Sequence, residues 1–576
     1  MESLKSLLPV LLPELILIAA ACVLFLVGMS TKATGRRAAA WVALLSLAGV
    51  FVLLLRGGAS DRPSVDDFET FRVWHFAHYI KLLVAGVGVL LTLLAWPTDR
   101  DATGNTSLNF GGDAGEFFAL MLLSLSGVML VAGANDMVTL FLGIELASIP
   151  TYIMVAVGRP IAAAQEAGLK YFFLGAMSAA LMLFGFSYLY GTTGTTNLYD
   201  IAGLMSGTLG SPTGTTAPSP WQILALLMIL AGFAFKIAAV PLHFYAGDVY
   251  QGAATPVTAF LSFVPKVTGI VAIIKILWVY GGGPDWAVPH TVAKLLWIMA
   301  VLTMTVGNLL GLLQLNVKRV LAYSSIAHSG YLLVGLTALA YAVGNPGVQQ
   351  SAMQAVLFYL AAYGIMNVGV FAVLQMLPCR DGRVATSAET FEDLAGQGRR
   401  HPALGLAMAV GCFSLIGLPL TVGFFGKLYL IFPAWELAKA SPAWSGAMTW
   451  LVIVTMLNAA ISAAYYLKIV ATMFLRPETP TFGLSAAERR GELSQPGWTR
   501  GAATPIALTL ALVLSSAATL GLGTIIPATQ LLSNKVVDAV EVDQRVEAPG
   551  LTAGSRGGWL GSSVAGERRP ERADVR

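Results

Sequence analysis

The chain alternates between long apolar runs and short polar segments. Fourteen runs, most of them about 18 to 25 residues long, have the length that crosses the hydrocarbon core of a bilayer as a helix. They are residues 5–28, 38–55, 74–95, 115–132, 136–157, 168–190, 221–241, 256–280, 291–313, 320–342, 351–377, 403–433, 445–475 and 503–527. None alternates with the period of two of a membrane-spanning β-strand. The pattern predicts an all-α polytopic membrane protein with about 14 transmembrane helices.

The amino-acid composition narrows the class of protein further. Apolar residues make up 56% of the 576 residues and charged residues 11%, whereas a soluble domain is about 25% charged. The net charge of +4 gives no indication of nucleic-acid binding. Cys22, Cys379 and Cys412 form no C-x-x-C pair, and no glycine-rich nucleotide loop is present. We therefore expect this chain to hold no metal and no redox or nucleotide cofactor of its own.

Lysine and arginine are unevenly distributed among the polar segments. Fifteen lie in segments after odd-numbered runs, and only five lie at the N-terminus or after even-numbered runs, when the seven in the tail after residue 527 are set aside. Because basic loops stay on the cytoplasmic side, both termini are predicted to be periplasmic. Residues 528–576 form a polar tail of nearly balanced charge, which we expect to be disordered.

A short motif occurs twice inside apolar runs. Gly-Phe-Ala-Phe-Lys at 232–236 is followed by Gly-Phe-Phe-Gly-Lys at 423–427, in the seventh and twelfth runs. Prolines interrupt both regions, at Pro241 and at Pro419 and Pro433. Five runs separate the copies, so the second is inverted in the membrane. Inverted repeats with broken helices are typical of transporters, whose sites lie near the bilayer midplane.

Four charged residues lie deep in these runs: Glu145, Lys236, Lys266 and Lys427. A charge in the membrane is costly, and its default interpretation is functional. Buried lysines beside a movable carboxylate can load and release protons, so these residues are candidates for a proton relay. The alternatives are a protonated carboxyl bonded to the backbone for Glu145, and lysines that reach the membrane surface.

Further candidates are less specific. Lys170 lies four residues after Glu166, so it is a relay candidate but equally suits a surface ion pair. His243 follows the break at Pro241, and His328 lies among serines; imidazole can give and take a proton near neutral pH. Three lysines nearer the run ends are predicted to reach the membrane surface: Lys81, Lys275 and Lys468.

Three segments carry a resemblance to a known family. They are Val240–Ser262 (VPLHFYAGDVYQGAATPVTAFLS), Lys318–Tyr331 (KRVLAYSSIAHSGY) and Leu415–Lys427 (LIGLPLTVGFFGK). With them the chain resembles the antiporter-like membrane subunits of the proton-pumping NADH-quinone oxidoreductase, respiratory complex I, over about residues 5 to 530. The string DVY at 248–250, and a lysine rather than a glutamate at 427, favour its subunit N group. Gly247 and Gln251 depart from the family's usual proline and glutamate.

The resemblance implies an organisation of the chain. Three N-terminal helices would occupy 1–114, two inverted five-helix repeats 115–280 and 291–475, and a last helix 503–527, before the tail 528–576. Helices 7 and 12 would be broken.

The resemblance also implies roles for individual residues. Glu145 would pair with Lys236, Lys266 would be the central lysine, Lys427 the exit lysine, and Lys170 part of the proton path. The chain would couple quinone reduction elsewhere in the complex to proton transfer. It would bind no cofactor itself, because other subunits would hold NADH, flavin, iron–sulfur clusters and quinone. Its partners would be subunit M and the small subunits K, J and A in a bacterial inner membrane.

Two other functions remain open at this point. A Mrp-type sodium/proton antiporter subunit would have a related sequence, but a sodium site favours clustered carboxylates, and Glu145 alone is clearly near the midplane. A structural membrane subunit without transport would have no need of four costly charges at that depth.

Overall fold

The computed structural model describes residues 2–29, 33–56, 75–97, 114–159, 161–205, 218–281, 289–342, 344–377, 388–440, 442–477 and 506–524. The predicted disordered tail lies outside these residues. The N-terminal half forms α1 (Glu2–Gly28), α2 (Ala33–Arg56), α3 (His75–Leu94), α4 (Ala114–Gly133), α5 (Met137–Val157), α6 (Ala162–Thr193), α7 (Leu198–Met205), α8 (Pro220–Lys236), α9 (Ala246–Gly252) and α10 (Thr255–Tyr280). The C-terminal half forms α11 (His290–Leu312), α12 (Val317–Tyr341), α13 (Pro346–Met376), α14 (Phe391–Leu394), α15 (Gln397–Arg400), α16 (Pro402–Ile416), α17 (Val422–Ala440), α18 (Ser445–Leu475) and α20 (Ile506–Thr524).

The described helices confirm the all-α membrane fold. Twelve of them are long and apolar enough to cross a membrane, and they coincide with twelve of the predicted runs. At the other two runs, 221–241 and 403–433, the described chain has shorter apolar helices, α8 and α16, each followed by a break. A total of fourteen crossings and the inversion of the two repeats stay predictions.

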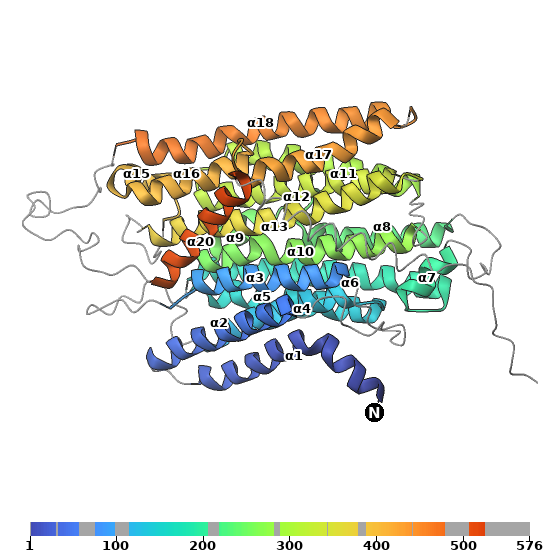
Figure 1. Cartoon of the computed structure of the whole chain (residues 1–576), viewed down its shortest axis with the longest axis horizontal. Coiled ribbons are helices and arrows are strands. Elements are labelled where there is room, and N and C mark those ends of the chain that lie inside the picture. The colour runs from blue at the N-terminus through green and yellow to red at the C-terminus, as the bar shows by residue number, and fades with distance from the viewer. Residues whose placement is uncertain are drawn as a thin grey trace, which may run out of the picture.

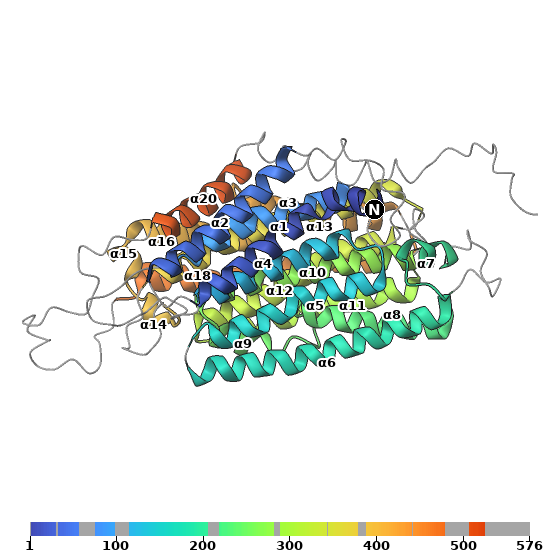
Figure 2. The same cartoon turned by 90° about the horizontal axis from the view of Figure 1, so that it is seen from below.

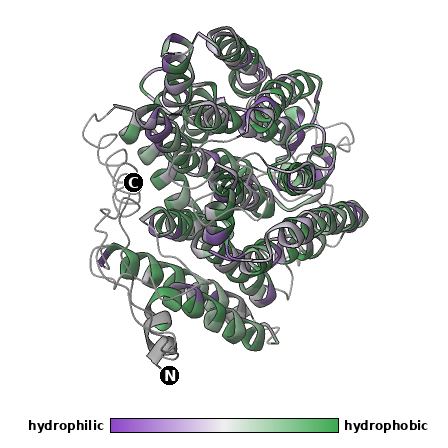
Figure 3. Cartoon of the chain, turned by 90° about the vertical axis from the view of Figure 1, so that its right-hand side faces the viewer, coloured by the Kyte–Doolittle hydropathy of each residue, from purple (hydrophilic) through white to green (hydrophobic). Residues whose placement is uncertain are grey.

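Most helices of the N-terminal half lie toward one edge of the molecule, and most helices of the C-terminal half lie toward the opposite edge (Figure 1). The N-terminal helices α1 and α2 lie at one edge and α18 at the opposite edge, with α6 along a third side (Figure 2). The helix α20 runs back obliquely and contacts α3, α13, α16 and α17. Seen end on, the bundle has apolar residues along its outer helices (Figure 3).

Three helices form the centre of the bundle. In each of α10, α12 and α13, 94% of the residues of an apolar stretch of 18 residues are buried inside the protein, so these helices are surrounded by other parts of the chain. The helix α10 contacts α4, α5, α8, α12 and α13, and therefore joins the two halves of the chain. Polar residues on these three helices have no route to solvent along a helix face and must find partners within the bundle.

Two breaks interrupt the helical path, at residues 237–245 and 417–421. Each contains a non-glycine residue in the left-handed region, Ala238 with φ 54° and Leu420 with φ 73°, a strained conformation that is common at functional sites. The two copies of the repeated motif differ relative to these breaks. Lys236 ends α8 before its break, whereas Lys427 follows the other break in α17.

Local signals explain where α8 and α5 begin. Ser219 caps α8 in a reciprocal capping box with Gln222, and Pro220 occupies the first turn, where its missing N–H costs nothing. Asp136 caps α5 by accepting from the backbone N–H groups of Val138 and Thr139. These caps fix the helices that carry Lys236 and Glu145.

Candidate functional site

Glu145 and Lys236 form an ion pair between α5 and α8. Lys236 Nζ lies 3.2 Å from Glu145 Oε1, and it also donates to Ser148 Oγ at 2.8 Å and to Tyr152 OH at 3.1 Å. The three partners follow one another at intervals of three and four residues, and therefore share a face of α5. Lys236 is also the last residue of α8, where the helix dipole stabilises a cation. The structure thus brings this predicted pair together.

Lys266 is held without a carboxylate. Its Nζ donates to the carbonyl oxygen of Ser325 at 2.6 Å and to Ser329 Oγ, both on α12. Ser329 Oγ in turn donates to the carbonyl oxygen of Ile237 at 2.6 Å, in the break after α8. None of the ion pairs among the described residues includes Lys266. Lys266 is therefore connected to the first break by neutral groups alone.

His328 lies between two lysines, in a cluster of tyrosines. Its Nδ1 lies 2.5 Å from Tyr359 OH, and its Nε2 lies 3.1 Å from Tyr466 OH. Its ring also packs against those of Tyr363 and Tyr331, with centroids 4.9 and 5.5 Å away.

The same two rings contact the lysines. Lys266 Nζ lies 5.8 Å from the Tyr363 ring centroid, and Lys427 Nζ lies 4.6 Å from that of Tyr331. Tyr363 OH donates to Ser325 Oγ at 3.1 Å. His328 and these tyrosines therefore fill the space between Lys266 and Lys427.

Lys427 returns to the helix that precedes its break. Its Nζ donates to the carbonyl oxygens of Leu415 at 2.9 Å and of Ile416 at 2.8 Å, at the end of α16. Such terminal carbonyls lack partners within their own helix. Gly423 permits the approach, because a Cβ there would lie 1.9 Å from the carbonyl oxygen of Ser414. Carbonyl dipoles, and no carboxylate among the described residues, accompany this lysine.

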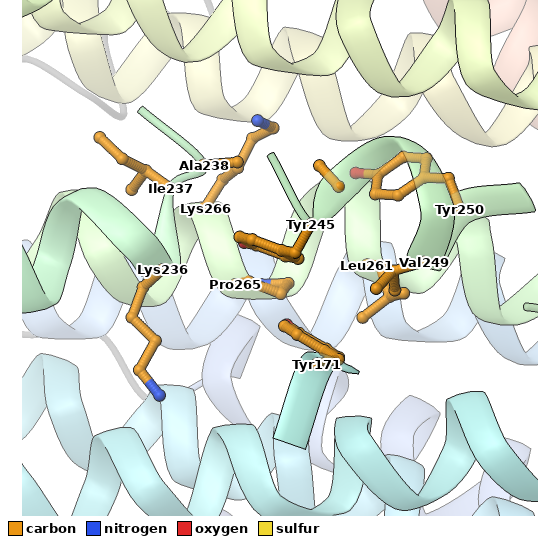
Figure 4. A pocket seen from close by; sticks show the side chains of 11 residues that line it. Tyr171, Lys236, Ile237, Ala238, Tyr245, Val249, Tyr250, Leu261, Pro265 and Lys266 are labelled. Carbon is orange, nitrogen blue, oxygen red and sulfur yellow. The ribbon is translucent and has the colours of Figure 1, made fainter. Parts of the chain in front are cut away.

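A small cavity lies between Lys236 and Lys266 (Figure 4). Its volume of about 10 Å³ is close to the minimum that holds one water molecule. The stems of both lysines line it, together with Tyr171, Tyr245 and Tyr250 among others. Figure 4 shows the two ammonium groups pointing to opposite sides, away from each other. The cavity therefore separates the two charged groups rather than joining them.

Two predicted relay candidates, Lys170 and His243, lie outside the row formed by Lys236, Lys266 and Lys427. Lys170 is exposed and forms ion pairs with Glu166 at 2.7 Å and with Asp248 at 3.1 Å, so the predicted surface pair is present. Asp248 also pairs with Arg319 at 3.1 Å. His243 lies in the first break, and within the described ranges its buried Nδ1 has no hydrogen-bond partner. A relay role for Lys170 or His243 stays a prediction.

The expectation that Lys81, Lys275 and Lys468 reach the membrane surface is wrong for two of them. Lys81 is 1% exposed and pairs with Glu14 at 2.6 Å between α3 and α1. Lys275 is 2% exposed and donates to the carbonyl oxygen of Ala134 at 2.7 Å. Both find a partner on a neighbouring helix, which removes any reason to reach the surface. Lys468 is exposed and lies over the Phe391 ring, and its reach to the membrane surface stays a prediction.

A second ionic cluster ties the two halves of the chain together. Glu389 accepts from Lys318 at 2.7 Å and from Arg159, and Lys318 also donates to the carbonyl oxygen of Ala253 at 3.1 Å. Arg159 follows α5, Ala253 precedes α10, and Lys318 begins α12. Burial opposes ionisation of Glu389, but the charges of Lys318 and Arg159 outweigh it and hold its pKa below the ordinary value. The cluster anchors the ends of three helices that carry the site.

Sequence reasoning missed the polar side chains that connect the charged residues. They are Ser148, Tyr152, Tyr331, Tyr359, Tyr363 and Tyr466. Ser325 and Ser329 were noted only as neighbours of His328, and their contact with Lys266 was not foreseen. Helical spacing contained a partial signal, because Ser148 and Tyr152 follow Glu145 by three and seven residues. No comparable signal marked Tyr359 or Tyr466, which meet His328 only through tertiary packing.

Known proteins are similar to this chain in both sequence and fold. Residues 134–462 match the family described as NADH:quinone oxidoreductase/Mrp antiporter, TM. NADH-quinone oxidoreductase subunit N of Trichlorobacter lovleyi is 38% identical over 479 residues, covering 82% of this chain and 88% of that relative. The chain belongs to the NADH-quinone oxidoreductase subunit N family. This agrees with the subunit N resemblance of the sequence motifs.

Solved structures place the subunit N fold in a wider group. A chain of respiratory complex I from Thermus thermophilus with bound aureothin has a TM-score of 0.67 and 28% identity, covering 91% of this chain and 99% of that chain. A chain of the Mrp complex from Dietzia sp. DQ12-45-1b has a TM-score of 0.70 at 19% identity, covering 93% and 99%. The second likeness shows a shared fold alone.

Proposed function

We propose that this chain is the proton-translocating subunit N of an NADH-quinone oxidoreductase, and that quinone reduction in other subunits drives proton transfer through Glu145 and its buried lysines. The observation that carries the proposal is the row of buried lysines Lys236, Lys266 and Lys427 on α8, α10 and α17, with Glu145 paired to Lys236 at one end. Each intramembrane charge costs about 2.5–3.5 kcal/mol on insertion scales. Four of them in one connected region are more than a scaffold needs.

The three lysines differ in the charge that remains beside each of them after it loses its proton. If Lys236 gave up its proton inside the pair, the partly buried carboxylate of Glu145 would remain without its counter-charge. Lys266 and Lys427 donate only to hydroxyl and carbonyl oxygens among the described residues, so their deprotonation leaves no unpaired anion. Breaking the Glu145–Lys236 pair is therefore the controlled step, and the other two lysines pass the proton on.

His328 and its tyrosines support transfer between Lys266 and Lys427. A neutral imidazole accepts a proton at one nitrogen and donates from the other, and a tyrosine hydroxyl both donates and accepts. The contacts of His328 with Tyr359 and Tyr466 satisfy both nitrogens at once. A proton taken up on one side of His328 can thus leave on the other, with the net charge of the site restored after each transfer.

The electron chemistry belongs to other subunits in this proposal. NADH, flavin, iron–sulfur clusters and quinone would be bound there, and this chain would contribute no cofactor-binding residues. Its partners would be the neighbouring antiporter-like subunit M and small subunits of the K, J and A type. It would lie in the inner membrane of a bacterium, with both termini on the periplasmic side because of the excess of basic residues in the opposite loops.

The second candidate function is sodium/proton antiport of the Mrp type. The matching family description and the shared fold of the Dietzia chain favour it as an alternative. The two functions differ in their cation, so NADH-driven proton uptake by vesicles is measured with and without sodium ions. Equal uptake supports the redox-driven pump, and a strict requirement for sodium supports antiport.

The experiment for the main proposal uses Glu145. Glu145→Gln keeps the size of the side chain but removes the charge that holds Lys236, and we expect NADH-driven proton uptake to fall to a small fraction of wild type at matched assembly. Glu145→Asp keeps the charge at a shorter reach and should retain part of the uptake. The control is Glu436→Gln, an exposed carboxylate on α17. Wild-type uptake by Glu145→Gln would contradict the proposal.

A further inference from the structure

The two lysines on either side of the cavity cannot exchange a proton directly. Their ammonium groups point to opposite sides, and the space between their stems has a volume of about 10 Å³, the room of about one water molecule (Figure 4). Proton transfer needs an unbroken chain of hydrogen-bonding groups from donor to acceptor. Something that borders the cavity must therefore move before a proton passes from Lys236 to Lys266.

Tyr245 is the residue best placed to control this space. It is the last residue of the break at 237–245, and its ring stacks on Phe235 with centroids 4.4 Å apart and on Tyr171 with centroids 5.2 Å apart. Tyr245 OH donates to the carbonyl oxygen of Phe235 at 2.7 Å. The hydroxyl thus fastens the ring to the end of α8, directly beside Lys236.

The aromatic stack continues to the ion pair. Tyr171 also packs edge-on against Tyr152, with centroids 4.6 Å apart, and Tyr152 OH accepts from Lys236 Nζ. A change in the Glu145–Lys236 pair therefore reaches Tyr245 through ring contacts. Since packed rings have a few discrete arrangements rather than a continuum, such a contact can switch the position of the last ring.

Other residues that line the cavity favour movement of the break and binding of water. Ala238 at the break is held in the left-handed region at φ 54°, so the segment before Tyr245 is strained. Pro265 on α10 has no N–H to donate to the carbonyl of Leu261 four residues earlier. Both Pro265 and Leu261 line the cavity. A backbone carbonyl that lacks its helical donor, on a residue that lines the cavity, is an acceptor for water that enters there.

We propose that Tyr245 is the gate between Lys236 and Lys266: its ring, fastened to Phe235, keeps the cavity too small for a chain of waters, and its rotation admits water that joins the two lysines. This inference rests on the proposed proton relay. Tyr245 is a positioning residue in it, because it neither gains nor loses the transferred proton.

The test is the passive proton permeability of vesicles that contain the assembled complex, measured without NADH as the decay of an imposed pH difference. Tyr245→Phe keeps the ring and removes the hydroxyl, so we expect the leak to rise about fivefold, the population shift that one net hydrogen bond contributes. Tyr245→Ala removes the ring, and its leak should exceed that of Tyr245→Phe. In both variants NADH oxidation should persist while fewer protons are moved per NADH.

The matched control is Tyr280→Ala. Tyr280 is likewise buried on a helix of the bundle and donates to a backbone carbonyl, that of Gln222 at 2.8 Å, but it does not line the cavity. A merely structural role for Tyr245 predicts equal leaks in Tyr245→Ala and Tyr280→Ala, and that result would overturn the gate. If Tyr245→Ala does not assemble, Tyr245→Phe decides, and an unchanged leak in that variant also overturns it.

A double variant separates the gate from the relay. In Tyr245→Ala with Lys266→Met, the leak should return to the wild-type level, because the open cavity then leads to no acceptor. A leak that persists means that the path avoids Lys266 and overturns the inference. If Lys266→Met alone pumps normally, the proposed function fails; if Lys266→Met is inactive but the Tyr245 variants do not leak, only the gate fails.

Discussion

The ammonium nitrogen of Lys427 lies 2.8 Å from the carbonyl oxygen of Ile416, the last residue of α16. A helix C-terminus has unpaired carbonyls and a partial negative charge, so the second break itself provides the acceptors for this lysine. Lys236, in contrast, precedes its break and has a carboxylate partner. The same short sequence motif thus ends in an ion-paired lysine at one break and a carbonyl-held lysine at the other.

Lys427 is expected to require a proton that can leave. Lys427→Ala removes the carrier, and Lys427→Arg keeps a charge that does not dissociate in proteins. Both variants should lose most NADH-driven proton uptake in vesicles at matched assembly. Lys468→Ala is the control, because Lys468 is exposed and contacts the Phe391 ring instead of the relay. Normal uptake by Lys427→Arg would show that this lysine acts by charge alone.

The Glu14–Lys81 pair is expected to stabilise the N-terminal helices. Glu14→Gln leaves Lys81 charged and buried, and losing one partner of a buried ion pair costs about 3–5 kcal/mol. The thermal unfolding midpoint in detergent should therefore fall. The double variant Glu14→Gln with Lys81→Met removes both charges and should recover most of the loss. A single variant as stable as wild type would show that the pair contributes little.

The Glu389 cluster predicts an acid-sensitive contribution to stability. Since the folded protein holds the pKa of Glu389 below its ordinary value of about 4.5, the contribution is complete above that pH and is lost as the pH falls through the lower, folded value. Glu389→Gln should lower the unfolding midpoint near neutral pH, and its difference from wild type should shrink in acid. An equal difference at every pH from neutral to strongly acidic would contradict this assignment.

The purified chain alone is expected neither to bind nor to oxidise NADH. Its sequence has no glycine-rich nucleotide loop, and no group of three or more metal-ligating side chains occurs among the described residues. Isothermal titration of the detergent-solubilised chain with NADH checks the expectation. A stoichiometric complex would mean that a nucleotide site exists here and that electron chemistry is not confined to other subunits.

The sequence predicted the fold well because membrane crossing imposes a simple rule. An apolar run of about 20 residues must become a helix in lipid, and the described helices follow the runs. The breaks were foreseeable at Pro241 and at Gly417 and Pro419, which disturb helical hydrogen bonding. The charged candidates were foreseeable for a related reason, since Glu145 and Lys266 are too costly to be accidental at that depth.

What could not be predicted depends on which helices become neighbours. Tyrosine is ordinary in helices, so nothing marked Tyr359 or Tyr466 before the fold brought them to His328. Lys81 was misjudged for the same reason. Its distance from the end of a run predicted a surface position, but the structure provides Glu14 on the adjacent helix. The distance in sequence from the end of an apolar run gives the depth of a residue along its own helix. It does not show which side chains the neighbouring helix places beside that residue.

The central claim is that protons cross the membrane through the lysine row of this chain, and Lys266 tests it most directly because it lies between the other two. The measurement is the number of protons moved per NADH oxidised, in vesicles with wild-type complex or with Lys266→Met, matched for assembly. The account predicts that Lys266→Met loses most of the translocation assigned to this subunit. A ratio equal to that of wild type would contradict it.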